Sequence, residues 1–320
     1  MAYRLYVFSV VFGVGLAPSG SVTAQQYPTK SVRILASGIG GATDFTARFL
    51  AAGLAARVGQ PVIVDNRAGG LVPGEIVARA PDAHTLMLTG AVTWLSPYMR
   101  SDMPFDPVRD FAPITMAVTQ PNVIVVYPGL PVKSVRELIA LAKDKPGVLN
   151  YASSGNGNST HLAAELFKSR AGVNIVQISY KLAAPAFTDL FSGRIEVMFP
   201  VASGAAPHVG AGRLRALAVA SLKPSELAPG LPTVAVAAGL PGYEYGSTLG
   251  LFAGASASAA IVNMLNREIV NLLTAPEARE RFFKAGMDIV ASSPAQFAEA
   301  IKVDMAQSGK VIQSASIRTD

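Results

Sequence analysis

The sequence lacks cysteine and contains three histidines and one tryptophan among its 320 residues. Without thiols the chain has no disulfide scaffold, no thiolate metal site and no cysteine nucleophile. The histidines are His84, His161 and His208, and their spacing matches none of the usual metal-binding motifs. The sequence therefore predicts no metal site. No cofactor is expected either.

Charged residues are also scarce. They make up 15% of the chain, and 27 Lys and Arg against 21 Asp and Glu give a net charge of +6 without any basic block. Because nucleic-acid-binding proteins gather positive charge in a patch or tail, nucleic acid is not expected as a partner. The 50% hydrophobic content excludes a disordered chain. The length corresponds to about two domains.

The N-terminus has the layout of a secretory signal peptide. Arg4 supplies a positive charge, an uncharged run extends from Leu5 to Leu16, and Val22 to Ala24 forms a small-x-small cleavage site. The run is shorter than the ~20 apolar residues of a membrane span, which disfavours the alternative of a retained anchor. We therefore expect cleavage after Ala24 and a periplasmic protein.

The remaining sequence alternates β-branched runs with amphipathic, alanine-rich segments, which is typical of an α/β fold with mainly parallel sheets. Strands are expected at residues 32–36, 62–64, 85–89, 122–127, 149–152, 174–179, 196–199 and 214–220. Helices are expected at residues 43–58, 74–80, 134–143, 160–171, 185–192, 203–209, 259–273, 276–285 and 294–307.

Irregular connections indicate two α/β domains. Proline-rich stretches at 104–113 and 128–131 and a long irregular stretch at 221–246 suggest that the chain crosses twice between them. We predict that residues 25–126 and 248–320 form domain 1, and that residues 127–247 form domain 2.

A glycine-rich turn, Gly38 to Asp44, follows the first predicted strand and opens the first helix. Backbone N–H groups freed by glycine beside a helix N-terminus form a cradle for an anion. A dinucleotide-binding fold begins in a similar way, and Asp65 stands where a ribose-binding acid would be. However, Thr43 occupies the sixth position of the fingerprint, where glycine or alanine is usual. The turn could also be a simple connection without a ligand.

A second polar segment, Ser153 to His161, also lies between a strand and a helix. Its hydroxyl and amide groups suit hydrogen bonds to a carboxylate or carbonyl. No Gly-x-Ser-x-Gly pentapeptide surrounds a serine here, so a nucleophile elbow is not indicated. His161 is a candidate base, although a packing or capping role is the commoner one for a histidine in this position. At a third strand end, Lys181 is a candidate positive charge for an anionic ligand.

Short motifs along the whole predicted mature chain resemble the tripartite tricarboxylate transporter receptor family, also called TctC or Bug. The motifs include Gly40-Gly41-x-Thr43-Asp44, Gly59-Gln60-Pro61-Val62, Asn66-Arg67, Pro81-Asp82-x-His84, Ser153-Ser154-Gly155-x-Gly157, Tyr180-Lys181-x-x-Ala184-Pro185, Leu231-Pro232-Thr233 and Pro241-Gly242-Tyr243-Glu244. Each motif is weak by itself, but they occur together, in order and at the right spacing.

The resemblance implies a periplasmic-binding-protein-like fold, in which two α/β domains close on a small carboxylate. It implies no catalysis, and as partners it implies the carboxylate and the membrane permease subunits of a tripartite tricarboxylate transporter, with the receptor itself a monomer. The expected ligand-binding residues lie on the two loops and near them: Ile39, Gly40, Gly41, Thr43, Asp44, Gly69, Thr93, Ser153, Ser154, Gly155, Asn158, His161 and Lys181.

The sequence departs from the family pattern at two places that bear on the ligand. The loop from Ala68 to Gly74 is short, and Leu182 replaces the glycine that usually follows Tyr-Lys. Either change would narrow the pocket or make it more apolar. Trp94 and Phe199 are candidates for a wall that stacks on a ligand ring.

Two alternatives remain open from the sequence. One is a secreted hydrolase or lyase that uses Ser154 or His161 with Asp44. The other is a solute sensor, whose closed form binds a signalling partner in place of a permease.

Overall fold

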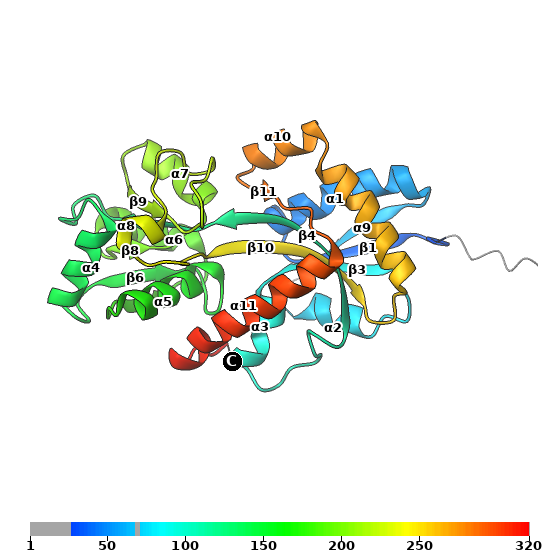
Figure 1. Ribbon diagram of the computed structural model, residues 1–320, viewed down its shortest axis with the longest axis horizontal. Coiled ribbons are helices and arrows are strands. Elements are labelled where there is room, and N and C mark those ends of the chain that lie inside the picture. The colour runs from blue at the N-terminus through cyan, green and yellow to red at the C-terminus, as the bar shows by residue number, and fades with distance from the viewer. Residues whose placement is uncertain (1–26, 68–70, 320) are drawn as a thin grey trace, which may run out of the picture.

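The computed structural model describes residues 27–67 and 71–319 as two lobes, each built around one sheet (Figure 1). The predicted signal peptide and Gly69 lie outside the described residues. The first lobe holds a six-stranded sheet in the order β11-β4-β10-β3-β1-β2, and the second lobe holds a five-stranded sheet in the order β7-β6-β8-β5-β9.

The first lobe is built from the N-terminal and C-terminal parts of the described chain. Its strands are β1 (Val32–Ala36), β2 (Val62–Asn66), β3 (Thr85–Gly90), β4 (Phe111–Pro121), β10 (Gly246–Gly254) and β11 (Asp288–Ile289). Its helices are α1 (Ala42–Val58), α2 (Val72–Ala78), α3 (Val92–Met99), α9 (Ala259–Leu273), α10 (Pro276–Lys284) and α11 (Pro294–Ser314).

The second lobe is one continuous insertion. Its strands are β5 (Val123–Val126), β6 (Asn150–Ser153), β7 (Val176–Ser179), β8 (Val197–Met198) and β9 (Arg215–Val219). Its helices are α4 (Val135–Asp144), α5 (Ser159–Ala171), α6 (Ala183–Ser192), α7 (Ala202–Gly210) and α8 (Val234–Ala238). β5 pairs in this sheet, although its residues were expected to belong to domain 1.

Both sheets are mixed, which corrects the expectation of mainly parallel sheets. β1 pairs in parallel with β2 and β3, and β6 pairs in parallel with β7 and β8. The strands that connect the lobes, β4, β5 and β10, make antiparallel pairs instead. The reason is topological. The chain leaves the first lobe through β4 and β5 and returns through β10, so the outgoing and returning strands run in opposite directions. The returning β10 therefore opposes β3 in the first sheet, and the outgoing β5 opposes β8 and β9 in the second.

The two lobes are joined by β4, which leads into β5 through Asn122, and by the return of the chain into β10. The Asn122 N–H donates to the Tyr245 carbonyl at 3.2 Å, and the Asn122 carbonyl accepts from the Ala220 N–H at 2.7 Å. The two connections are therefore bonded to each other where they pass between the lobes. Helix α11 also packs against both lobes, on α3 and β4 of the first and on α5 of the second (Figure 1).

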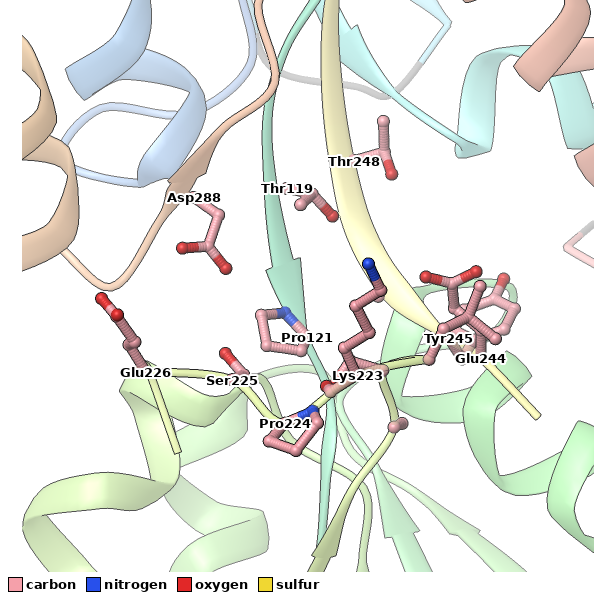
Figure 2. Close-up of a pocket in the computed structure, with 14 residues that line it drawn as sticks. Thr119, Pro121, Lys223, Pro224, Ser225, Glu226, Glu244, Tyr245, Thr248 and Asp288 are labelled. Carbon is pink, nitrogen blue, oxygen red and sulfur yellow. The ribbon is translucent and has the colours of Figure 1, made fainter. Parts of the chain in front are cut away.

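A cavity of about 550 Å³ lies beside these connections (Figure 2). Thr119 and Thr248 line it from β4 and β10, Asp288 lines it from β11, and Lys223 and Glu226 line it from the segment after β9. It is thus formed by both lobes.

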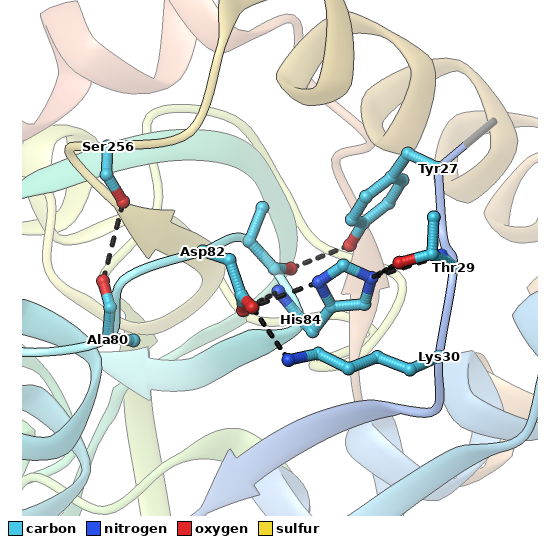
Figure 3. Close-up of polar contacts among 8 residues, drawn as sticks. Tyr27, Thr29, Lys30, Ala80, Asp82, His84 and Ser256 are labelled. Atoms are coloured by element: carbon cyan, nitrogen blue, oxygen red, sulfur yellow. Dashed lines mark hydrogen bonds and ion pairs between the residues drawn. The ribbon is translucent and has the colours of Figure 1, made fainter. Parts of the chain in front are cut away.

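The start of the described chain is fastened to the residues that precede β3 (Figure 3). The Tyr27 hydroxyl donates to the Ala83 carbonyl at 2.6 Å, and Lys30 forms an ion pair with Asp82 at 2.8 Å. The His84 ring packs against Tyr27 with 4.9 Å between ring centroids. These contacts fix the chain just before β1.

The aromatic core of the first lobe includes Trp94, which contacts Phe252 and Phe297 at 6.1 Å between ring centroids. Trp94 is 3% exposed, and Phe199 in the second lobe is 1% exposed. The expectation that these two rings form a ligand-stacking wall is therefore wrong, because both are used to pack the interior. Within the described residues no helix is long and apolar enough to cross a membrane.

Candidate functional site

Strand directions bring the two predicted loops to the facing ends of the lobes. β4 runs from the first lobe toward the second, and β10 runs back, antiparallel to it. β3 is antiparallel to β10, and β1 is parallel to both β3 and β2, so all three strands end toward the second lobe. β8 is antiparallel to β5, so β8, β6 and β7 end toward the first lobe. Ligands of α/β proteins bind at the carboxyl ends of such strands.

The first loop is held by the carboxylate of Asp44. Asp44 Oδ2 accepts from the Gly40 N–H at 3.0 Å and from Arg48 Nε at 3.1 Å. Asp44 Oδ1 accepts from Asn66 Nδ2 at 2.9 Å, and the same Nδ2 reaches the Gly38 carbonyl at 3.3 Å. The hydrogen bond from Arg48 and that from Gly40 lower the pKa of Asp44 to about 2. Asp44 is 5% exposed and already carries three donors, so it shapes the loop from within.

With Asp44 turned inward, the loop presents backbone to the space between the lobes. Gly38 and Gly40 have positive φ angles of 54° and 80°. Gly41 is the N-cap of α1, and no side chain caps this helix. A Cβ atom placed on Gly41 would meet no atom within 4 Å. The first-turn N–H groups of α1, including that of Thr43, therefore remain open to an anion.

The second loop is tied together by its own side chains. Asn158 caps α5 by accepting from the His161 N–H at 3.1 Å, and its Nδ2 donates to Ser154 Oγ at 2.9 Å. The Ser154 N–H donates to Thr160 Oγ1 at 3.0 Å. Gly155 and Gly157 have φ angles of 131° and 73°, which a residue with a side chain rarely adopts. The segment is therefore a turn that its own side chains hold through hydrogen bonds.

His161 supports this turn from below. Its Nδ1 accepts from the Gly157 N–H at 3.1 Å, and the residue is 3% exposed. Burial lowers the pKa of His161 to about 4, so the ring is neutral at pH 7. Ser154 Oγ bonds to Asn158 and lies 3.2 Å from Thr160 Oγ1. In the described chain, no hydrogen bond links Ser154 to His161, so the structure does not place His161 as a base on this serine.

Gln177 and Asn156 connect the second loop to its surroundings. Gln177 Nε2 donates to Ser153 Oγ at 2.8 Å and to Asn156 Oδ1 at 3.1 Å. Asn156 Nδ2 in turn donates to the Arg318 carbonyl at 3.3 Å. Sequence reasoning missed Gln177, and its place in the middle of a predicted strand gave no signal of this role.

The third predicted region is the end of β7. Lys181 is exposed, and Leu182 is the N-cap of α6 without a side-chain cap. The Tyr180 hydroxyl donates to Asp189 Oδ2 at 2.7 Å, which fixes the start of the turn on α6. Lys181 therefore projects from an anchored turn.

Thr93 lies in the first turn of α3, shortly after the carboxyl end of β3, and is 2% exposed. Its hydroxyl is 2.7 Å from that of Thr89. Helix α3 starts after Ala91 without a side-chain cap, so this end too offers backbone N–H groups. The described residues that the sequence predicted thus lie in two groups, one on the loops of the first lobe and one on the loops of the second. Each group is stabilised by hydrogen bonds within its own lobe.

The cavity at the crossing strands contains none of the predicted site residues. Burial, and then the charge of Glu226, raise the pKa of Asp288, and burial raises the pKa of Glu244. Three carboxylates against Lys223 make this cavity unfavourable for an anion. Within the described residues, no group of three or more His, Cys, Asp or Glu could hold a metal ion.

Comparison with known proteins identifies the family. The model of the tripartite tricarboxylate transporter family receptor matches residues 46–317. The chain belongs to this family. A relative from Pseudomonas sp. strain P51, the UPF0065 protein of the tcbD-tcbE intergenic region, is 33% identical over 95% of this chain and 93% of its own length. Protein BugT of Bordetella pertussis is 32% identical over 89% of this chain and 90% of its own length.

Solved structures of this family superpose on nearly the whole chain. R. palustris Rpa4515 with adipate has a TM-score of 0.78 and 32% identity, covering 91% of this chain and 99% of its own. MatC from Rhodopseudomonas palustris with bound malate has a TM-score of 0.73 and 26% identity, covering 89% and 100%. Family members and structural neighbours are solute-binding receptors, so the chain is a receptor of the periplasmic-binding-protein fold and not an enzyme.

Proposed function

We propose that this protein is a periplasmic receptor that captures a small carboxylate and delivers it to the membrane permease of a tripartite tricarboxylate transporter. The proposal takes the carboxylate from two neighbours, which are described with adipate and with malate. The permease and the periplasm come from the family to which the chain belongs.

The observation that carries the proposal is the open N-terminus of α1 in the first loop. A helix N-terminus carries a partial positive charge and unpaired N–H groups, which suit a carboxylate. Here Asp44 organises the preceding turn from its buried side, and Gly41 leaves the outer side clear. A carboxylate can therefore approach the backbone to hydrogen-bond distance.

The second loop supplies the opposing surface in this proposal. Ser154, Gly155 and Asn158 stand at the carboxyl end of β6, which points toward the first lobe. Their hydroxyl, backbone and amide groups can complete the hydrogen bonds of a carboxylate when the lobes close. We propose that the lobes act as two domains that hinge where β4 meets β5 and where the chain enters β10, and that the receptor works as a monomer.

Calorimetry with a panel of small acids tests the proposed function. Adipate, malate, succinate and citrate are titrated separately into the purified protein, with arginine and glucose as ligands of other classes. The account predicts saturable binding of at least one acid, recovered chemically unchanged, and no binding of arginine or glucose. Binding of arginine or glucose alone, or conversion of a bound acid, would contradict it.

A further inference from the structure

Two large apolar side chains stand in solvent on the loops of the candidate site. Ile39 is 81% exposed and Leu182 is 68% exposed. Ile39 sits between Gly38 and Gly40, which both have positive φ angles. Leu182 directly precedes α6. Both side chains therefore project from turns that the backbone holds in place.

The two residues belong to different lobes and to edges that point toward each other. Ile39 follows β1, which ends toward the second lobe, and Leu182 follows β7, which ends toward the first. Apolar surface in water is unfavourable, and closure of the lobes on a ligand would remove it. An apolar part of the ligand is the simplest group that both side chains can cover.

The same loops carry few charges. On the described connections from β1, β2, β3, β6, β7 and β8 to the helices that follow them, the charged residues are Arg67 and Lys181, and Asp44 in the first turn of α1 is paired with Arg48. Arg67 is held by Asp65, with Nε 2.9 Å from Oδ1. Lys181 is then the one cation on these described loops without a carboxylate partner. A ligand with three carboxylates would be poorly neutralised here.

We propose that the ligand is a linear aliphatic carboxylate whose chain bears no hydroxyl groups, and that Ile39 and Leu182 enclose its methylene groups. This inference rests on the proposed function, because the carboxylate is placed at α1. A hydroxylated or tricarboxylic acid is disfavoured, since a hydroxyl pressed between the two side chains would lose water without gaining a hydrogen bond.

A chain-length series tests the inference by calorimetry. Succinate, glutarate, adipate and pimelate differ by methylene groups, and malate adds one hydroxyl to succinate. The dissociation constant should fall about fourfold with each added methylene until the cleft is filled. Malate should bind more weakly than succinate. Tighter binding of malate or citrate than of adipate would overturn the inference.

Two substitutions then locate the effect. Ile39→Ala and Leu182→Ala should each weaken adipate binding by about tenfold and flatten the chain-length series. Val236→Ala is the matched control, because Val236 is 71% exposed on α8 and belongs to neither loop. An unchanged chain-length series in both variants would overturn the inference.

The two proposals fail in different ways. If none of these acids binds to the folded protein, the proposed function fails. If acids bind but the longer unsubstituted ones gain nothing, the receptor function stands and the apolar subsite is refuted.

Discussion

The Asp44 carboxylate accepts the N–H of Gly40 at 3.0 Å, so the first turn of α1 bonds back to the loop that precedes it. Arg48, one turn later, bonds to the same carboxylate oxygen. A residue that the sequence suggested as a ligand contact is thus engaged in holding the glycine turn open. The contacts of Asp44 make the backbone, rather than an acidic side chain, the surface that an anion would meet.

Replacing Gly41 by Val should abolish binding of the carboxylate ligand and leave the fold intact. A Cβ at Gly41 meets no protein atom within 4 Å, so the valine would occupy only the approach to α1. Gly210→Val is the control, because a Cβ there also meets nothing and Gly210 ends α7 in the other lobe. Calorimetry and the melting temperature measure the two effects. Normal binding by Gly41→Val would remove this loop from the site.

Asp44 should make the protein sensitive to strong acid. Its pKa is lowered from 3.8 to about 2 in the folded state, so the stabilisation is complete above pH 4 and is lost as the pH falls through 2. The free energy of unfolding should decrease by about 2 kcal/mol over this range from this group alone. Denaturant unfolding of the wild type and of Asp44→Asn measures it, and an identical acid dependence in both proteins would contradict the assignment.

The contribution of His161 to the free energy of unfolding should change at higher pH than that of Asp44. Burial lowers its pKa from 6.5 to about 4 in the folded state, so the unfolded chain takes up the proton first. The free energy of unfolding should therefore fall by about 3 kcal/mol as the pH decreases from about 6.5 to 4. His161→Gln should lack this component. The imidazole resonances of His161 should show no titration between pH 5 and 8, and a midpoint near 6.5 would refute the account.

Gln177 should affect affinity more than stability. Its side chain donates hydrogen bonds to Ser153 and to Asn156, and the Asn156 side chain donates to the backbone carbonyl of Arg318. Loss of these bonds loosens the second loop, so Gln177→Ala should weaken ligand binding by about fivefold, corresponding to about 1 kcal/mol of lost hydrogen bonding. Gln313→Ala on the exposed side of α11 is the control. Equal affinities of the two variants would contradict the role of Gln177.

Most elements could be predicted from the sequence where local periodicity is strong. β1 and α9 have the predicted bounds, because β-branched runs and helical spacing of apolar residues extend to their ends. No strand was expected at β4, and the proline-rich connection expected at residues 104–113 overlaps its first three residues. Pro113 is accommodated where the register of β4 against β10 shifts, so the missing N–H costs no regular ladder bond. Such a register shift depends on the partner strand, which local sequence does not reveal.

The two loops of the candidate site were also predictable, since each combines glycine and polar residues between a strand and a helix. The direction of individual side chains was not. Thr93 and His161 turned out to be buried, and Ile39 turned out to be exposed. Whether a polar residue faces the cleft or supports the loop from behind is decided by tertiary packing. Residue type alone does not carry that information.

A crystal structure of the protein with adipate tests the central claim most directly. The account predicts one carboxylate of adipate within hydrogen-bond distance of the backbone N–H groups that follow Gly41, with the loop after β6 closed over it. Adipate bound in the cavity between Thr119, Thr248 and Lys223, or a structure in which the first loop makes no contact with the ligand, would contradict the account.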